Sequence, residues 1–292
     1  MERLQKVMAD AGIASRRHCE EMITEGKVKV NGTVVNKLPV MVEPDHDVIL
    51  VEGRKLRFSP KVYYLLNKPK KVICTNIDPQ GRVRAIDMLP PAVKQRVYPV
   101  GRLDTDSQGL IILTNDGDLA NQLTHPSYGV TKTYVCEIAS KIDGNDIEKL
   151  KKGFYVLYRG RVTMDRVKIL KRGLHGSVIE ITLKEGRNRQ IRRMLSKLGH
   201  KVKKLTRVKI GPIDDRGLGV GKCRPLTNKE VEQLRKIIEK NKAKEKETKT
   251  ERKTASGPKT KKTTKKVARN TSTKNVAQKP KTDKPKRRII VS

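Results

Sequence analysis

"VGRLDTDSQGLIILTND", residues 100–116, is the stretch that decides the fold. Its four consecutive large aliphatic residues, 110–113, are typical of a strand that is covered on both faces. The preceding residues 101–108 carry one arginine and two aspartates, Arg102, Asp104 and Asp106. A loop that leads into a buried strand stands on a rigid base, which suits a reactive side chain. The stretch therefore predicts a buried strand over 109–114 and candidate functional residues in the loop before it.

The two carboxylates allow more than one interpretation. Asp104 and Asp106 are two residues apart, so in extended backbone their side chains would point the same way. A glycosidase could use such a pair as its acid and base. An isolated Asp-x-Asp is more often a pair of turn-forming residues that stabilise a loop. The motif alone favours the second interpretation, and the rest of the chain has to decide.

The segments around this stretch predict an α+β fold with a largely antiparallel sheet, because strands outnumber helices and do not alternate with them. Residues 61–75 give two strand-like pieces broken at Pro69. Further strands are expected at 96–100, 132–138, 160–170, 177–183 and 200–211. Helices are expected at 118–126, 143–153, 189–199 and 227–240. Neither a phosphate-binding P-loop nor a GxGxxG motif is present, so the sequence does not indicate a nucleotide cofactor.

The N-terminal residues predict a compact helix–helix–hairpin module. Leu4, Val7, Met8 and Ala11 have the spacing of one helix face. Ser15 is placed to cap a second helix, and Asn31 followed by glycine is typical of a tight hairpin turn. A further strand is expected at 47–53, and 52–60 has the composition of a linker. Several basic residues gather near the start of the second helix, where phosphate is favoured; an ordinary solvated surface is the alternative.

The net charge predicts a polyanionic partner. The 292 residues carry a formal charge of +36. Residues 241–292, the basic tail, contain 19 Lys and Arg against 4 Asp and Glu, without aromatic residues or apolar periodicity. We expect this tail to be disordered and either to add non-specific RNA affinity or to serve as an inert solubilising extension. A membrane partner is disfavoured, because no apolar run approaches the roughly 18–20 residues that span a bilayer.

The cysteines and histidines do not suggest a metal site. The four cysteines lie far apart without a CxxC pair, and the five histidines are equally scattered. Such scattered cysteines are typical of reduced thiols in a cytoplasmic protein. The N-terminus lacks the apolar core of a secretion signal. We therefore expect a cytoplasmic protein without a metal or other cofactor.

An arginine-rich helix is expected near residues 189–198. On a helical wheel Ile191, Met194 and Leu195 share one side with Leu198. Arg189 and Arg193 fall nearly opposite and should meet solvent or RNA, whereas Arg192 lies at the border of the apolar stripe. Arg192 is thus the arginine best placed to turn inward and to pair with Asp104, which would keep that carboxylate ionised.

The N-terminal module resembles the alpha-L RNA-binding motif, first known from a small-subunit ribosomal protein. The resemblance rests on "RLQKVMADAGIASRRHCEEMITEGKVKVNG". It implies that two helices and the following hairpin bind structured RNA, and we assign residues 1–57 to this domain. The candidate contacts, mainly to phosphate and sugar, are Arg3, Lys6, Ser15, Arg16, Arg17, Lys29 and Asn31.

The following segment resembles the pseudouridine synthase family, in particular the group that modifies single uridines in ribosomal RNA. The resemblance rests on "GRLDTDSQGLIILTND", "KTYVCEI" and "EGRNRQIRRML", in this order behind the alpha-L module. It implies a pseudouridine synthase catalytic domain over 61–236. The family usually reads Lys-Pro-x-Gly where this chain has Lys71. That departure concerns the geometry of one loop and leaves the catalytic motif intact.

The resemblance implies a function and roles for individual residues. It favours isomerisation of a uridine in large-subunit (23S) ribosomal RNA by a monomer without cofactor; a small-subunit (16S) enzyme and a non-catalytic ribosome assembly factor are the alternatives. Asp104 would act at the sugar, either by covalent attack or by proton abstraction, and Arg192 would stabilise it. Tyr134 would stack on the target base, although a lone strand tyrosine is usually a core residue. Arg102 would help to hold the flipped nucleotide, Arg189 and Arg193 would contact RNA, and Asp106 would shape the loop.

Overall fold

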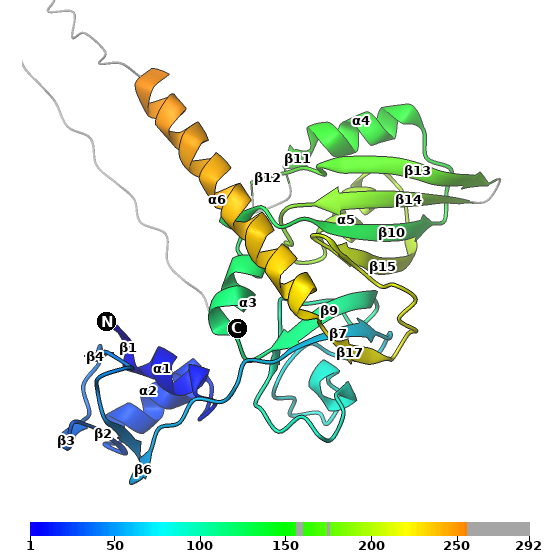
Figure 1. Ribbon diagram of the computed structural model, residues 1–292. Coiled ribbons are helices and arrows are strands. Elements are labelled where there is room, and N and C mark those ends of the chain that lie inside the picture. Colours follow the sequence, from blue (N-terminus) through cyan, green and yellow to red (C-terminus); the bar gives the residue numbers. More distant parts are fainter. Residues whose placement is uncertain (156–159, 174–175, 256–292) are drawn as a thin grey trace, which may run out of the picture. The chain divides into compact units, whose positions relative to one another are not determined.

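The computed structural model describes residues 1–155, 160–173 and 176–255 (Figure 1). By their packing contacts the residues form two units, Met1–Thr250 and Glu251–Ser292. Only residues 251–255 of the second unit are described, and they belong to a helix. Within the described ranges, no helix combines the length and the apolar character that a bilayer crossing requires.

The N-terminal module has two helices and two small antiparallel sheets. Ser15 caps the second helix, because its Oγ accepts a hydrogen bond from the His18 N–H at 3.2 Å. Asn31 and Gly32 have φ angles of 50° and 84°, which confirms the predicted hairpin turn. The predicted helix face of Leu4, Val7 and Met8 is buried in the module's core. The elements are β1 (Glu2–Arg3), α1 (Leu4–Asp10), α2 (Arg16–Thr24), β2 (Val28–Val30), β3 (Thr33–Val35), β4 (Met41–Val42), β5 (Ile49–Val51) and β6 (Arg54–Lys55).

The larger domain is built on a mixed sheet. Its strands run in the order β13-β14-β10-β15-β9-β7-β17, with β16 beside β15 and β8 beside β9. Each of these pairs is antiparallel except β9 with β15, which confirms the predicted fold class. The strands are β7 (Tyr63–Lys68), β8 (Tyr98–Pro99), β9 (Gln108–Thr114), β10 (Lys132–Ile138), β13 (Arg166–Gly173), β14 (Gly176–Leu183), β15 (Val202–Ile210), β16 (Ile213–Asp214) and β17 (Cys223–Pro225). A separate pair is formed by β11 (Phe154–Tyr155) and β12 (Arg161–Val162).

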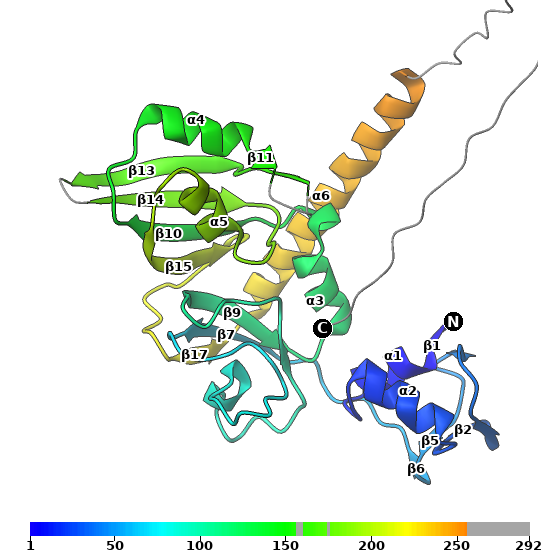
Figure 2. The same cartoon turned by 180° about the vertical axis from the view of Figure 1, so that it is seen from behind.

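Strand β9 is covered on both faces, as its aliphatic run predicts. Ile111 and Leu113 belong to one core cluster and Leu110 and Ile112 to another. Helices α4 (Gly144–Lys152) and α5 (Gln190–Lys197) pack into the first cluster. Helices α3 (Gly117–Thr124) and α6 (Asn228–Ala255) pack into the second. Figures 1 and 2 show α5 and α6 on opposite faces of the sheet. Two short 3₁₀ helices complete the domain, Ala85–Met88 and Pro126–Tyr128.

Three features differ from the sequence prediction. The expected strand after Pro69 is a loop, in which Lys71 has a left-handed φ of 68° and Ile73 forms one isolated bridge. The segment expected as one strand at 160–170 is divided between β12 and β13. Helix α6 continues to Ala255 and so enters the basic tail that we expected to be disordered from residue 241. Lysine and glutamate make up eight of the 15 residues 241–255, which lack proline and glycine, so helix propensity outweighs the missing apolar face. Residues 256–292 lie outside the described part.

Candidate active site

The loop that carries Asp104 is fixed by backbone contacts on both sides. The Lys71 N–H donates to the Thr105 carbonyl at 2.7 Å, and the Ser107 N–H donates to the Asp104 carbonyl at 3.0 Å. Leu103 is buried, and its N–H contacts the Cys74 sulfur at 3.4 Å. Lys71 has a left-handed φ of 68°, a conformation that glycine adopts most easily, and the loop nevertheless closes with lysine at this position. Asp104 therefore has a defined backbone from which its carboxylate projects.

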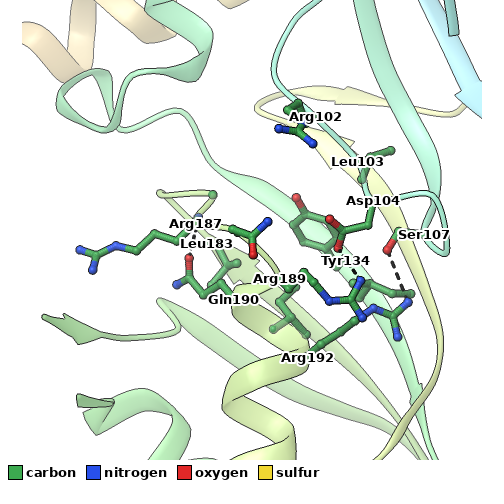
Figure 3. A pocket seen from close by; sticks show the side chains of 14 residues that line it. Arg102, Leu103, Asp104, Ser107, Tyr134, Leu183, Arg187, Arg189, Gln190 and Arg192 are labelled. Carbon is green, nitrogen blue, oxygen red and sulfur yellow. Dashed lines mark hydrogen bonds and ion pairs between the residues drawn. The ribbon is translucent and has the colours of Figure 1, made fainter. Parts of the chain in front are cut away.

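The Asp104 side chain opens into a cavity of about 230 Å³ (Figure 3). The carboxylate side chain is 30% exposed. The cavity lies between the Asp104 loop, strands β10, β14 and β15, and the start of α5. Its wall is formed by Arg102, Leu103, Asp104, Ser107, Tyr134, Leu183, Gly186, Arg187, Asn188, Arg189, Gln190, Ile191, Arg192 and Leu205. Charged groups thus share a small space with apolar side chains, which strengthens electrostatic interactions there.

Tyr134 is placed at this cavity by its strand. It lies on β10, opposite Ile181 of β14 and Arg207 of β15, and is 9% exposed. Figure 3 shows its ring beside the Asp104 carboxylate. An aromatic face next to a carboxylate is suited to holding a flat base against a reacting sugar.

The ion pairs around Asp104 differ from those predicted from the helical wheel. Arg189 Nη1 lies 3.5 Å from Asp104 Oδ2 and 3.2 Å from Asp106 Oδ1. Arg192 pairs with Asp106 instead, with Nη2 3.2 Å from Oδ2. The wheel misplaced Arg189 because α5 begins at Gln190. Arg189 precedes the helix in a left-handed conformation, φ 50° and ψ 33°, so its side chain does not follow the helical register.

Arg192 contacts the residues that follow Asp104 rather than the Asp104 carboxylate itself. Its side chain is 13% exposed, which agrees with the prediction that it turns inward. Nη2 donates to the Asp106 carbonyl at 3.2 Å and contacts the Ser107 hydroxyl at 3.5 Å. Nη1 donates to the Val202 carbonyl of β15 at 3.4 Å. One guanidinium therefore ties α5, β15 and the residues after Asp104 together.

Asp106 forms ion pairs with both Arg189 and Arg192. Burial favours its neutral form, but the hydrogen bond from Arg189 and the charges of Arg192 and Arg189 outweigh burial and lower the pKa of the Asp106 carboxyl. Its carboxylate is 48% exposed. Asp106 has the contacts of a structural ion-pair partner, in line with its assignment to the loop.

Several residues at the site were missed by sequence reasoning. Gln190 is buried, accepts from the Arg187 N–H at 3.0 Å and donates to Glu185 at 3.0 Å. Lys68 is fully buried below the loop and donates to the carbonyls of Pro69 and Val72, each at 2.8 Å. Burial lowers the pKa of its ammonium group. Lysine is so rarely buried that no local pattern indicates such a role.

The predicted RNA contacts fall into two groups. Arg3, Arg16, Arg17 and Lys29 are exposed and form no ion pair or side-chain hydrogen bond with other described residues. Lys6, Ser15 and Asn31 have intramolecular partners: Lys6 binds Glu2 at 3.1 Å, Ser15 caps α2, and Asn31 bonds Asp47 and Val48, each at 2.9 Å. In the larger domain, Arg193 is exposed and donates to Asn188 at 2.9 Å.

The described residues contain no cluster of three or more His, Cys, Asp or Glu that could hold a metal ion. The chemistry present at the cavity is therefore that of a carboxylate, a phenol and guanidinium groups.

Comparison with known proteins gives the family. Residues 62–197 match the RNA pseudouridylate synthase family, and residues 2–48 match the S4 domain. The chain belongs to the RNA pseudouridylate synthase family and carries an N-terminal S4 domain, the RNA-binding module described above.

Individual relatives agree with this assignment. The chain is 45% identical over 244 residues to ribosomal large subunit pseudouridine synthase B of Bacillus subtilis, covering 83% of this chain and 99% of that protein. It is 36% identical over 240 residues to the protein of the same name from Pseudomonas aeruginosa, covering 80% of this chain and 61% of the relative. A crystal structure of a pseudouridylate synthase superposes with a TM-score of 0.57 at 30% identity, covering 80% of this chain and all of the other.

Proposed function

We propose that this protein converts one uridine of large-subunit ribosomal RNA into pseudouridine, with Asp104 as the catalytic carboxylate. The observation that carries the proposal is the cavity where Asp104 lies beside Tyr134. The similarity to large-subunit enzymes supports the choice of RNA. The cavity, about 230 Å³, lies below the roughly 300–1,000 Å³ of pockets for drug-sized ligands, which suits a single pyrimidine ring.

The proposed reaction uses the side chains of Asp104 and Tyr134 at the cavity, with Arg192 in support. The base leaves the ribose by cleavage of its N-glycosidic bond, turns in the cavity, and rejoins the same ribose through C5, which gives up its proton while N1 gains one. Asp104 acts at the sugar, as nucleophile or as proton acceptor. Tyr134 stacks on the base, and Arg192 acts indirectly by anchoring the Asp104 loop through Asp106. Because no atom is gained or lost overall, the reaction consumes no co-substrate.

The target uridine has to leave its helix before it can enter the cavity. Extrusion of a base costs a few kcal/mol, which phosphate contacts offset. Arg102 lines the cavity, is exposed, and forms no ion pair or side-chain hydrogen bond with other described residues, so its guanidinium is free to bind the flipped nucleotide. The exposed basic residues of the S4 domain, Arg3, Arg16, Arg17 and Lys29, would hold the folded RNA.

The test is Asp104→Asn. We expect pseudouridine formation in a ribosomal RNA transcript to fall on the order of 10⁴-fold, with RNA affinity retained. Asp106→Asn is the comparison variant, because one amide oxygen still accepts hydrogen bonds from the arginines although the charge and the second acceptor oxygen are lost. It should lose less activity than Asp104→Asn, whereas a glycosidase that uses both carboxylates would lose activity to a similar extent in both variants. Pseudouridine formation by Asp104→Asn at the normal rate contradicts the proposal.

The RNA itself is identified by mapping pseudouridines in cells that lack the protein. We expect one modification to disappear from 23S ribosomal RNA. Disappearance from 16S ribosomal RNA would instead identify a small-subunit enzyme. Unchanged maps of both RNAs, together with defective assembly, would favour a non-catalytic assembly factor.

A further inference from the structure

A second, larger cavity adjoins the one described above. It has a volume of about 460 Å³ and lies between the Asp104 loop and the loop that follows β7, of which residues between 73 and 82 form its far wall. This volume falls within the roughly 300–1,000 Å³ of pockets that hold drug-sized ligands, so it can hold a whole nucleotide. Four residues line both cavities, Arg102, Leu103, Asp104 and Arg189. The two cavities therefore meet at the carboxylate that acts on the ribose.

An RNA strand whose uridine enters the smaller cavity has to pass this boundary. A ribose placed at Asp104 carries a phosphate on each side, and one of these phosphates has to lie near the residues that both cavities share. Arg102 is one of them, is exposed, and forms no ion pair or side-chain hydrogen bond with other described residues. Its guanidinium can bind the phosphate that joins the uridine to its neighbour, which places that neighbour in the second cavity.

The far wall presents a second arginine in a fixed orientation. Arg82 Nη2 donates to Asp78 Oδ1 at 2.6 Å, and Nε donates to Oδ2 at 3.1 Å. The Asp78 side chain is 4% exposed, whereas that of Arg82 is 51% exposed. Arg82 Nη1 forms no hydrogen bond or ion pair with another described residue, so a guanidinium that its own carboxylate holds in place still has donors for a phosphate.

The charges of the second cavity favour an anionic ligand. Each of its carboxylates has a cationic partner: Asp78 pairs with Arg82, and Asp104 and Asp106 pair with Arg189. Arg102 is the cation that lines the cavity without a partner among the described residues.

An exposed aliphatic side chain stands at the rim of this cavity. Ile77 is 76% exposed and lines the cavity together with the buried Ile73. Single exposed aliphatic residues are common on protein surfaces, but the backbone of Ile77 is also fixed. The Thr75 hydroxyl donates to the Ile77 carbonyl at 2.8 Å and accepts from the Ile77 N–H at 3.3 Å. A fixed apolar surface beside two arginines offers one face to a base and two cations to the flanking phosphates.

We propose that the second cavity is a binding site for the nucleotide next to the target uridine in the RNA strand. Arg102 binds the phosphate between the two nucleotides, Arg82 binds the neighbour's other phosphate, and Ile77 contacts its base. The inference rests on the proposed function, because the site is defined relative to the uridine at Asp104. It makes the loop after β7 a contributor to the choice of RNA sequence.

The first test is a double-mutant cycle between protein and RNA. A synthetic RNA stem-loop that contains the mapped uridine carries an abasic residue either directly before or directly after that uridine. Ile77→Ala is compared with Leu170→Ala, which truncates an exposed aliphatic side chain of β13 that lines neither cavity. The readouts are the RNA dissociation constant and the single-turnover rate at saturating RNA.

We expect Ile77→Ala to weaken RNA binding about three- to tenfold with wild-type thermal stability, because the side chain is exposed. One of the two abasic RNAs should bind the wild-type protein more weakly by a similar factor, and Ile77→Ala should cause no further loss with that RNA. With the other abasic RNA the two losses should multiply. Leu170→Ala should bind every RNA like the wild type.

The second test addresses the phosphate at Arg82. The double variant Asp78→Asn with Arg82→Gln removes both charges, so the net charge of the protein is unchanged and the new side chains can still hydrogen-bond. The slope of log K against log salt should fall by about 0.7–0.9, the value for one phosphate. The matched control is Glu232→Gln with Lys236→Gln, which removes an exposed ion pair of α6 and should leave the slope unchanged.

Three results would overturn the inference. Independent losses for Ile77→Ala with both abasic RNAs would show that Ile77 contacts no flanking base, and equal coupling to both would indicate a general misfit of the RNA. A wild-type salt slope in the Asp78→Asn, Arg82→Gln variant would show that Arg82 binds no phosphate. Absence of pseudouridine formation by the wild-type protein in the unmodified RNA is a separate outcome: it would refute the proposed function, while the dissociation constants would still report on the cavity.

Discussion

At the scale of single residues, Asp104 and Asp106 show how one residue type acquires two roles within three positions. Asp106 receives both Arg189 and Arg192, and these cations lower the pKa of its carboxyl. Asp104 lines the cavity and shares Arg189 with Asp106. A carboxylate whose oxygens are occupied by two guanidinium groups is poorly available to a substrate, whereas Asp104 retains access to the cavity.

A glycine at the start of β9 is expected to contribute to the stability of the fold. Gly109 has a φ of 112° and pairs with Arg207 where β9 and β15 run parallel. A Cβ added at Gly109 would overlap the backbone of Arg207. We predict that Gly109→Ala lowers the free energy of unfolding by about 1–3 kcal/mol, measured by urea denaturation.

The control for this prediction is Gly144→Ala at the start of α4. Nothing lies within 4 Å of a Cβ at Gly144, so its unfolding free energy should change by less than about 0.5 kcal/mol. Equal stability of the two variants would show that β9 and β15 can separate without cost.

At the scale of elements, helix α6 begins with a capping box. The Glu230 N–H donates to the Thr227 hydroxyl at 3.2 Å, and the Thr227 N–H donates to Glu230 Oε2 at 2.9 Å. Arg224 binds the same carboxylate with two donors, each at 2.8 Å. Glu230 is 2% exposed, so the start of α6 depends on one buried carboxylate.

This carboxylate predicts a loss of stability in acid. The hydrogen bonds from Arg224 lower the pKa of Glu230 from 4.5 to about 2 although burial opposes them. Because the folded-state pKa is depressed, its contribution is complete above pH 4.5 and is lost as the pH falls towards 2. It amounts to at most about 3 kcal/mol.

The measurement is the pH dependence of the unfolding free energy of Glu230→Gln. The variant should be less stable than wild type above pH 4.5 and should vary less with pH below it. Glu232→Gln is the control, because Glu232 is exposed and pairs only with Lys236 of the same helix among the described residues. Parallel pH profiles for wild type and Glu230→Gln would contradict the assignment.

The sequence predicted elements where periodicity or capping is strong. The aliphatic run of β9, the Ser15 cap and the apolar stripe of α5 all have local signatures, and the structure confirms them. It could not predict that Arg189 leaves the helical register, because a left-handed arginine depends on tertiary contacts around it. The same limit explains the missed loop at Lys71 and the buried Lys68, since each depends on segments distant in the sequence.

At the scale of the whole molecule, RNA binding is a matter of which charges remain unpaired. The S4 domain keeps Arg3, Arg16, Arg17 and Lys29 exposed and unpaired among described residues, while Lys6 pairs with Glu2 and Asp118 and Asn31 bonds Asp47. The number of basic residues overestimates the number available to bind RNA, because some of these residues pair with other residues of the same protein. The net charge of +36 nevertheless implies strongly salt-dependent binding.

The basic tail supplies a large share of that charge and can be tested by truncation. We predict that removing 256–292, or 242–292, leaves the saturating rate unchanged, since neither deletion removes any of the described residues that line the cavity. Both truncations keep Asn241, whose side chain donates to the Tyr128 carbonyl at 2.9 Å. RNA affinity should weaken, and the slope of log K against log salt should fall by about 0.7–0.9 for each phosphate that the truncated protein no longer neutralises.

A full-length variant with the lysines and arginines of 256–292 changed to glutamine separates charge from chain length. If the tail acts by electrostatic attraction, this variant should bind like the shorter truncation at every salt concentration. If its affinity matches wild type across the whole series, the tail is an inert solubilising extension. In that case the folded residues must account for all of the phosphate binding, because their own excess of basic side chains remains.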